Sequence, residues 1–343
     1  MADVVYFYPR GHEKHFQAGH PERPERVEHI KTGLENMQLW DRFPKLEPVQ
    51  VPGDVLESVH TPAYLQTLEE SSSRARNLDM DTYTTQESWP LALQAAGGGL
   101  AVARRVWGAE TEAGFALTRP PGHHATSSRG MGFCLLNNVA LAAEDLLQQQ
   151  DAERVAIVDV DLHHGNGTQD IFYDRGDVFY LSTHQAPFYP GTGSLNETGT
   201  GQGERKTLNI PLPAGTGDAA FKVIQEEIFL PVLTRFQPQM LLISYGFDTH
   251  WRDPLGGLQL SAACIADQIK ALHRFAEENC QGRFAVFLEG GYDLKAGAVC
   301  AQGIVSRLIG EPWEDRLGPS PNPEGGEWKS VVQHIQQEWS LDR

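Results

Sequence analysis

Four short apolar runs in this chain each end at a Gly or Pro break or at a polar cluster that carries reactive side chains. The runs cover 113–125 (AGFALTRPPGHHA), 155–168 (VAIVDVDLHHGNGT), 240–250 (MLLISYGFDTH) and 284–293 (FAVFLEGGYD). Short runs rich in Val, Ile, Leu and Phe that end in this way are typical of β-strands. The sequence therefore predicts four strands whose C-terminal ends carry acidic, histidine and tyrosine side chains.

Helical patterns separate these runs, and the alternation indicates the fold class. The patterns lie at about 137–149, 218–235 and 261–279. Strands that alternate with helices form a mostly parallel sheet with helices on both faces. Ligands of such sheets bind beyond the carboxyl ends of the strands. We therefore expect an α/β protein whose reactive groups meet at one edge of the sheet.

The chain is predicted to form a single domain over 1–343. Its 343 residues, 40% of them hydrophobic, are enough to bury a large core, and no linker or repeat interrupts 1–310. α/β folds of this length often form one domain. The motifs lie in about 1–310, and 311–343 indicates a Pro/Gly-rich loop followed by a last helix at about 327–339.

The run at 155–168 places three polar residues at alternating positions of a strand. Because successive side chains of a strand point to opposite faces, Asp159, Asp161 and His163 are predicted to share one face. Buried carboxylates are costly unless they are paired or bind a metal. The pattern indicates a divalent metal site, and a polar strand end that faces solvent is the alternative.

Composition and spacing exclude several other classes of function. A formal charge of −17 disfavours direct nucleic-acid binding, which requires a basic surface. No apolar run approaches the ~20 residues of a membrane span, and the N-terminus lacks the features of a signal peptide. Four cysteines without a CxxC spacing favour a reduced protein. We therefore expect a cytoplasmic location.

The segment 185–217 is rich in Gly and Thr and has little regular pattern, so we expect a long functional loop. Its sequence GTGTGQGERK lacks the GxxxxGK[ST] spacing of a phosphate-binding loop. Nucleotide binding is therefore not predicted.

Longer motifs carry a family resemblance. In chain order these are GHPERPERV, RPPGHHA with GFCLLNN, DVDLHHGNGTQDIF, YPGTG, SYGFDTHWRDPLGG and LEGGYD. Together they resemble the histone deacetylase family of the arginase/deacetylase superfamily, and HHGNGTQ and DPLGG resemble its class II branch and bacterial relatives. The resemblance covers nearly everything up to about residue 310 and implies the arginase/deacetylase fold.

The resemblance implies one catalytic zinc held by Asp161, His163 and Asp248. Three protein ligands leave an open position for water and a substrate carbonyl. Two carboxylates and one histidine also suit Fe(II), so the metal's identity stays open. A structural potassium site in relatives matches the main-chain carbonyls of Asp159, Asp161 and His163 together with Ser182 and Thr183.

The resemblance also implies the acid–base pair. His123 and His124 follow a rigid Arg-Pro-Pro-Gly segment, and the second histidine of this pair serves the family as general base and then general acid. Asp159 would hydrogen-bond His123, whereas Asn166 would lie beside His124. Because an amide cannot stabilise imidazolium as a carboxylate does, His124 is expected to stay neutral and accept a proton.

Other positions match the family's substrate site. Tyr292 matches the tyrosine that donates to the developing oxyanion, and Gly290 and Gly291 would give its backbone freedom. Phe133 and Tyr189 match the two aromatic walls of the acyl-lysine tunnel. Further positions are a backbone acceptor at Gly132, a rim residue at Leu255, and Arg26, which resembles an arginine of an internal cavity, with a surface salt bridge as its alternative.

These features lead to a predicted function with open alternatives. We expect a zinc-dependent amidohydrolase that removes acetyl or another short acyl group from the lysine of a peptide or protein. An acetylpolyamine amidohydrolase, which acts on a small acylated amine, is the first alternative, and Leu255 disfavours it because that branch places glutamates at the rim. A catalytically silent binding module and a dimanganese arginase-type enzyme are less favoured. The natural substrate and the oligomeric state are not predicted.

Overall fold

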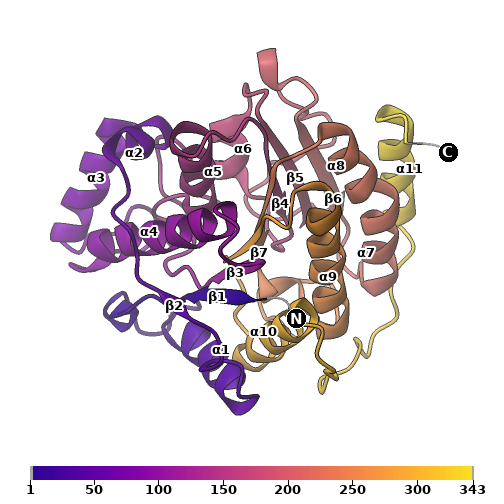
Figure 1. Cartoon of the computed structure of the whole chain (residues 1–343), viewed down its shortest axis with the longest axis horizontal. Helices are drawn as coiled ribbons and strands as arrows, with labels where there is room; N and C mark the ends of the chain where they lie inside the picture. The colour runs from indigo at the N-terminus through magenta and orange to yellow at the C-terminus, as the bar shows by residue number, and fades with distance from the viewer. Residues whose placement is uncertain (1–2, 342–343) are drawn as a thin grey trace.

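A single parallel sheet runs through the protein. The computed structural model describes residues 3–341, which contain eight strands in the order β2-β1-β3-β8-β7-β4-β5-β6, every neighbouring pair of them parallel (Figure 1). The strands are β1 (Val4–Phe7), β2 (Lys45–Leu46), β3 (Ala113–Ala116), β4 (Val155–Asp159), β5 (Val178–Gln185), β6 (Thr207–Leu212), β7 (Met240–Tyr245) and β8 (Phe284–Leu288).

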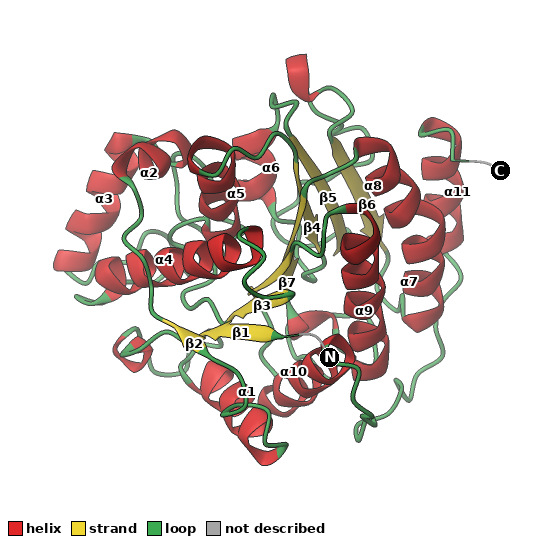
Figure 2. Ribbon diagram, in the orientation of Figure 1, coloured by secondary structure: helices red, strands yellow, loops and turns green. Residues whose placement is uncertain are grey.

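Helices cover both faces of this sheet (Figure 2). One face carries α2 (Gly53–Val59), α3 (Pro62–Ser73), α4 (Ser88–Trp107), α5 (Asn138–Gln149) and α6 (Asn166–Phe172). The other carries α1 (Glu25–Asn36), α7 (Asp218–Ile224), α8 (Leu230–Phe236), α9 (Ala262–Asn279), α10 (Leu294–Leu308) and α11 (Trp328–Glu338). A π-helical turn, Gln225–Phe229, joins α7 to α8, and short 3₁₀ turns lie at His12–Lys14, Gly201–Gly203 and Phe247–Thr249.

The period of two along each strand divides the core into two layers. In β4, Ile157 packs into the layer under α4 and α5, whereas its neighbour Val158 packs into the layer under α9 and α10. Both side chains are fully buried. Because β4 is covered on both faces, its residues are apolar until the strand ends at Asp159.

The predicted elements are present. The four apolar runs form β3, β4, β7 and β8, and the predicted helices correspond to α5, the α7–α8 segment, α9 and α11. The α7–α8 segment is continuous because the π turn connects its two α-helical parts. Met1, Ala2, Asp342 and Arg343, at the ends of the predicted domain, lie outside the described residues. Within 3–341, no helix has the length and apolarity that crossing a bilayer requires.

The expectation of a continuous irregular loop over 185–217 is wrong at its end. Residues Thr207–Leu212 form β6, which pairs with β5 at the edge of the sheet. Pro211 within this strand hides the signal, because proline cannot donate to a ladder and is tolerated only at an edge. The irregular parts are therefore the segment between the two strands and the short turn at 213–217.

The strand at 155–168 is also shorter than expected. The ladder of β4 ends at Asp159, so Asp161 and His163 lie in the following loop rather than on the strand. The loops that follow β3, β8, β7 and β4 emerge from four neighbouring strands at the centre of the sheet. Their polar residues meet beyond the carboxyl ends, as expected for an open parallel sheet.

Candidate active site

Asp161, His163 and Asp248 form a compact cluster of possible metal ligands. One ligand atom from each residue lies within 4.8 Å of the others. His163 Nδ1 is 3.2 Å from Asp161 Oδ1 and 3.2 Å from Asp248 Oδ2. Asp161 and His163 come from the loop after β4, and Asp248 comes from the 3₁₀ turn after β7. The structure therefore brings together the three residues that the sequence proposed as ligands.

Backbone amides orient the two carboxylates. Asp161 accepts hydrogen bonds from His163 N and Gly290 N, both at 2.8 Å, and Asp248 Oδ1 accepts one from Leu162 N at 3.1 Å. Asp248 Oδ2 is buried, and among the described residues its polar contact is the ion pair with His163 Nδ1 at 3.2 Å, which lacks the geometry of a full hydrogen bond. A buried carboxylate oxygen without a full hydrogen bond costs free energy unless it binds a cation. This oxygen, which faces His163, is where a metal would fit.

Two glycines make room for these carboxylates. A Cβ on Gly246 would lie 1.8 Å from Asp161 Oδ2, and a Cβ on Gly290 would lie 2.2 Å from Asp248 Oδ2. Both distances are below the 3.0 Å that non-bonded Cβ contacts essentially always exceed. A side chain at Gly246 or Gly290 would therefore displace the carboxylates of the cluster.

The electrostatics of the cluster also suit a cation. Burial lowers the pKa of His163, but its hydrogen bonds and proximity to Asp161 and Asp248 outweigh burial and raise it to about 9. Burial and the charge of Asp161 raise the pKa of Asp248. Two buried carboxylates that repel each other create a negative potential, which a divalent ion held by N and O ligands would neutralise.

The tandem histidines lie beside this cluster with different partners. His123 Nδ1 is 3.1 Å from Asp159 Oδ2, and His124 Nδ1 is 2.8 Å from Asn166 Oδ1. Burial lowers the pKa of His123, yet the charges of Asp159 and Asp161 raise it to about 10. Burial and the positive charges of His123 and His163 hold the pKa of His124 well below its usual range. His123 is thus the charged member of the pair and His124 the neutral one.

The hydrogen bond to Asn166 also determines the tautomer of His124. An amide oxygen only accepts, so Nδ1 of His124 carries the proton and donates it to Asn166 Oδ1. Nε2 therefore keeps its lone pair. His124 has the protonation state and the free nitrogen that a general base requires.

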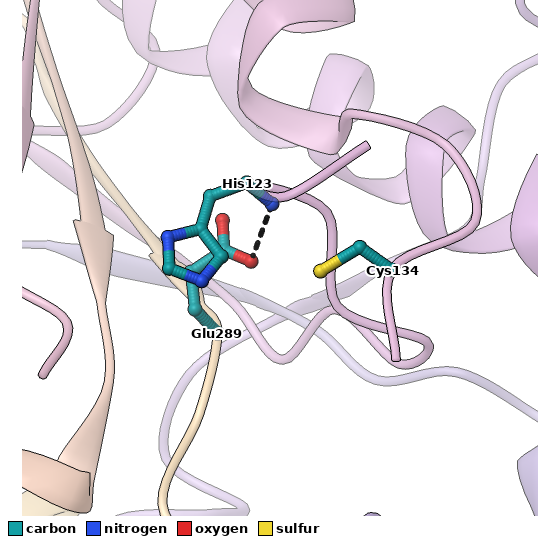
Figure 3. A group of neighbouring side chains, drawn as sticks. All are labelled: His123, Cys134 and Glu289. Carbon is teal, nitrogen blue, oxygen red and sulfur yellow. Dashed lines mark hydrogen bonds between the residues drawn. The ribbon is translucent and has the colours of Figure 1, made fainter. Parts of the chain in front are cut away.

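Glu289, from LEGGYD, holds the histidine loop in place. Its Oε2 accepts hydrogen bonds from Gly122 N at 2.7 Å and His123 N at 3.1 Å, and its Oε1 accepts one from Ser244 Oγ at 2.9 Å. Figure 3 shows Glu289 together with His123 and Cys134, which form a second close group of possible ligands. Both oxygens of Glu289 accept hydrogen bonds from the protein. We therefore interpret His123, Cys134 and Glu289 as a structural group in which Glu289 stabilises the histidine loop.

Tyr292 faces the cluster from the loop after β8. Its backbone N donates to Asp253 Oδ2 at 2.6 Å, and its ring packs edge-on against Phe133 with 5.9 Å between centroids. The guanidinium carbon of Arg26 lies 4.9 Å from the ring centroid. Gly291 has φ 110°, which L side chains rarely adopt. The two glycines and these contacts fix the direction of the tyrosine.

A cavity of about 240 Å³ leads to the cluster. Aromatic rings form its walls: Tyr189 lies edge-on to His124 at 5.2 Å, and Phe188 stacks on His163 at 5.6 Å between centroids. Gly132 and Phe133 both have positive φ, and a Cβ on Gly132 would lie 2.4 Å from the ring of His124. The residues that line the cavity include His123, His124, Gly132, Phe133, His163, Tyr189, Leu255, Gly290 and Tyr292, as the sequence proposed.

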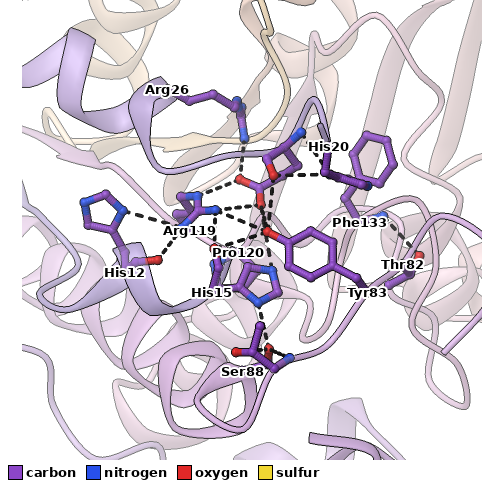
Figure 4. Close-up of polar contacts among 12 residues, drawn as sticks. His12, His15, His20, Arg26, Thr82, Tyr83, Ser88, Arg119, Pro120 and Phe133 are labelled. Carbon is purple, nitrogen blue, oxygen red and sulfur yellow. Dashed lines mark hydrogen bonds and ion pairs between the residues drawn. The ribbon is translucent and has the colours of Figure 1, made fainter. Parts of the chain in front are cut away.

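A buried ion-pair network lies behind this site (Figure 4). Glu22 and Arg119 are both fully buried, with Nε and Oε1 2.7 Å apart. Burial raises the pKa of Glu22, but Arg119 and Arg26 outweigh it and lower the value to about 2. Arg26 also donates to the carbonyl oxygens of Glu289 and Gly291. A surface salt bridge for Arg26 is therefore wrong, because the residue is buried against the tyrosine loop.

Of the two side chains proposed as potassium ligands, Ser182 has another polar partner and Thr183 has none among the described residues. Ser182 pairs with Asp159 in the register of β4 and β5, and its Oγ is 3.0 Å from His184 Nδ1. Thr183 Oγ1 is buried without a hydrogen-bond partner in the part of the chain that is described. Potassium binding stays a prediction.

Sequence reasoning missed several residues of the site. Phe188 lines the cavity but lies in a loop whose path no local pattern indicates, whereas Asp81, which also lines it, belongs to the acidic segment 79–87 that the sequence offers for the polyamine alternative. Asp253 supports Tyr292 and Asp293 through their backbone amides, and burial together with the charge of Asp248 raises its pKa to about 7. Glu289 stands inside a motif that the sequence had singled out, so its burial beside the histidines could have been anticipated.

The family of the chain follows from comparison with known proteins. Residues 20–308 match the model of the histone deacetylase domain. A probable deacetylase of Archaeoglobus fulgidus is 43% identical over 302 residues, covering 87% of this chain and 84% of the relative. A histone deacetylase-like amidohydrolase of Pseudomonas aeruginosa is 34% identical over 295 residues, covering 85% and 78%.

A solved structure supports the same family on the basis of its fold. The crystal structure of the HDA15 HD domain superposes with a TM-score of 0.89 at 32% identity, covering 98% of this chain and 94% of that one. The fold and site define a hydrolase of the α/β class built on the arginase/deacetylase fold. The chain belongs to the histone deacetylase family.

Proposed function

We propose that the protein is a zinc-dependent amidohydrolase that removes acetyl or another short acyl group from the side-chain amine of lysine. The observation that carries this proposal is the meeting of three groups at the end of one aromatic-walled cavity. These are the Asp161–His163–Asp248 cluster, the neutral His124, and Tyr292.

The chain's own residues divide the chemistry among them. His124 Nε2 accepts the proton of the attacking water and then donates it to the leaving amine. The positive charge of His123, maintained by Asp159, keeps His124 from protonating too early. The hydroxyl of Tyr292 donates to the oxygen of the tetrahedral intermediate. When bound, zinc would supply Lewis-acid polarisation of the carbonyl and lower the pKa of the water.

The shape of the cavity suits a lysine side chain. Its volume of about 240 Å³ is small, and rings of Phe133, Phe188 and Tyr189 line it. Apolar walls favour the methylene stem of lysine, and the acyl carbonyl would reach the cluster between His124 and Tyr292. These features support an extended acylated amine as the substrate.

Metal content and activity test the proposal together. We expect about one zinc per chain by elemental analysis, hydrolysis of acetyl-lysine peptides, and inhibition by hydroxamates, which chelate a metal with an open position. Asp248→Asn should lose both the metal and activity, whereas Asn279→Asp on the exposed end of α9 should change neither. Full activity in protein free of metal would contradict the proposal. If elemental analysis finds iron in place of zinc, the site is correct and the metal is iron.

One observation favours a second candidate, an acetylpolyamine amidohydrolase. The carboxylate of Asp81 lines the cavity together with Leu255, and it offers a charge to a distal ammonium. Burial and a hydrogen bond to Asp79 raise the pKa of Asp81. Leu255 offers no charge at all.

Relative kcat/KM values separate the two candidates. We expect the kcat/KM for acetyl-lysine peptides to exceed that for acetylspermidine, because Leu255 offers no charge to the second amine. Leu255→Glu should narrow the gap about tenfold or more, since a charge-assisted hydrogen bond contributes ~1.5–3 kcal/mol. Leu255→Gln, of similar size but neutral, is the control. If the unmodified protein prefers acetylspermidine tenfold and Asp81→Asn abolishes that preference, the second candidate is correct.

A further inference from the structure

The amide of Asn166 determines which ring nitrogen of His124 carries the proton. Asn166 Oδ1 lies 2.8 Å from His124 Nδ1 and accepts its proton in a hydrogen bond. If the two ends of the amide were exchanged, Asn166 Nδ2 would donate to Nδ1, and the proton of the neutral ring would lie on Nε2. That arrangement leaves Nε2 without the lone pair that a general base requires. The direction of the amide is therefore essential to the proposed chemistry.

Neither the position of the two side chains nor His124 itself selects this direction. His123 O accepts hydrogen bonds from Gly167 N at 3.0 Å and Thr168 N at 3.2 Å, which hold the histidine loop against the start of α6. These bonds fix where the two side chains lie. The oxygen and nitrogen of an amide are closely similar in shape, and a neutral imidazole presents either a donor or an acceptor at Nδ1. Another partner must therefore distinguish the two ends of the amide.

That partner is the thioether of Met131. Among the described residues, the side chain of Asn166 makes one hydrogen bond besides that to His124, in which Nδ2 donates to Met131 Sδ at 3.5 Å. Arg129 Nη2 donates to the same sulfur at 3.1 Å. A thioether sulfur is a weak acceptor and never a donor, so it can pair with Nδ2 but not with Oδ1. The sulfur therefore favours the direction in which Oδ1 faces His124.

The turn that forms one wall of the cavity holds Met131 in place. Cys134 N donates to Met131 O at 2.9 Å, across a turn whose central residues are Gly132 and Phe133. Both central residues have positive φ, as in a type I′ turn. Gly132 and Phe133 belong to the lining of the cavity, whereas Met131 does not. Met131 is half-buried behind that wall, on the side of the acid–base pair.

We propose that Met131 is a positioning residue, whose sulfur directs the amide of Asn166 so that His124 keeps a lone pair on Nε2. This inference rests on the proposed function, in which His124 is the general base. The sulfur is needed because the partner of His124 is an amide. A carboxylate in the same place would present an oxygen in either direction.

Nitrogen NMR of the full chain tests the tautomer independently of activity. Proton–nitrogen correlation spectra of histidine-labelled protein distinguish a ring nitrogen that carries a proton from one that does not. The signals of His124 are those missing from His124→Ala. We expect the proton on Nδ1 in the unmodified protein. In Met131→Leu, which removes the acceptor at similar volume, the ratio of the Nε2–H form to the Nδ1–H form should rise by about twofold to tenfold, as expected for one net hydrogen bond.

Kinetics on an acetyl-lysine peptide measure the consequence for the reaction. Met131→Leu should lower kcat by about twofold to tenfold. KM should stay unchanged, because the sulfur directs the base and does not line the cavity. Met131→Lys should lose more kcat than Met131→Leu, because an ammonium donates to Oδ1 and so favours the exchanged direction. Met37→Leu, the same exchange at the end of α1, is the matched control and should change neither value.

A double-mutant cycle with Asn166→Asp separates positioning from packing. Because either oxygen of the carboxylate accepts, its direction no longer matters. Met131→Leu added to Asn166→Asp should therefore leave kcat unchanged at the plateau of the pH profile. If Met131 only packs against its neighbours, Met131→Leu lowers kcat by the same factor with and without Asn166→Asp.

Two results overturn the proposal. An unchanged tautomer of His124 in both Met131→Leu and Met131→Lys means that the sulfur does not direct the amide. Equal losses of kcat, or equal drops in melting temperature that account for them, with and without Asn166→Asp make Met131 a packing residue. If the unmodified protein does not hydrolyse acetyl-lysine, the proposed function fails, and the tautomer in Met131→Leu still decides whether the sulfur directs the amide.

Discussion

The different partners of the two histidines lead to a prediction about pH dependence. Replacing Asn166 by Asp would place a carboxylate where Asn166 Oδ1 now lies, 2.8 Å from His124 Nδ1. Asn166 is half-buried and is the first residue of α6, where a negative charge is favourable. We therefore expect Asn166→Asp to fold and to stabilise the protonated form of His124.

The size of the effect follows from the hydrogen bond. A hydrogen bond to a charged group contributes ~1.5–3 kcal/mol, against ~0.5–1.5 kcal/mol for a neutral one. The difference of about 1–1.5 kcal/mol corresponds to about one pKa unit. Direct Coulomb attraction at this separation, with an effective dielectric of about 20, gives an upper limit of about four units.

The sign of the change is fixed by the role of His124. As general base it must be neutral, so activity is lost as the pH falls through its pKa. Burial and the charge of His123 hold that pKa low in the unmodified protein, which extends activity to acidic pH. In Asn166→Asp the pKa rises, and the acidic limb of the kcat/KM profile should move upward by at least about one pH unit.

The assay is the pH profile of kcat/KM on an acetyl-lysine peptide, with Asn166→Ala as the control. The alanine variant removes the acceptor without adding charge, so its acidic limb should stay in place or move to lower pH. An acidic limb of Asn166→Asp that coincides with that of the unmodified protein would refute the assignment of His124 as the base.

Three further predictions concern neighbouring groups. His124→Ala should lose more kcat/KM than His123→Ala, by about 10²–10⁴-fold; equal losses would contradict the division of roles. Tyr292→Phe should lower kcat about 10²–10³-fold with unchanged metal content, and a fully active variant would remove the tyrosine from the mechanism. Gly290→Ala, whose Cβ would lie 2.2 Å from a carboxylate oxygen of the cluster, should weaken metal affinity by about 10–100-fold in titrations. Gly53→Ala, where a Cβ meets nothing within 4 Å, should leave metal affinity unchanged. Equal metal affinities of the Gly290→Ala and Gly53→Ala variants would contradict the argument that a Cβ at Gly290 crowds the cluster.

The central strands and the cluster of reactive groups could be predicted from the sequence because their signals are local. A strand buried on both faces consists of apolar residues, so the first charged residue marks its end, as at Asp159. Reactive groups that follow such ends meet because parallel strands present their carboxyl ends on one edge. Asp161, His163 and Asp248 were therefore expected to meet at this edge, and the family resemblance implied that they bind one metal.

Features that depend on tertiary contacts could not be predicted in this way. β6 carries a proline and lies at an edge, so its composition is that of a loop. Phe188 reaches the cavity through the path of a loop, and Arg26 donates to the carbonyl oxygen of Gly291 only because α1 packs beside the tyrosine loop. Such contacts leave no periodic pattern in the sequence.

The position of the reactive loops in the sheet has a consequence for how the protein loses function. The four loops follow β3, β8, β7 and β4, which are consecutive and have neighbours on both sides. The amides of central strands are generally the slowest to exchange with solvent, because they open only in global unfolding. Loops at the mouth of the cavity, such as those that carry Asp81 and Tyr189, can open separately. Heating should therefore relax substrate selectivity first, and hydrolysis itself should disappear only when the whole sheet melts.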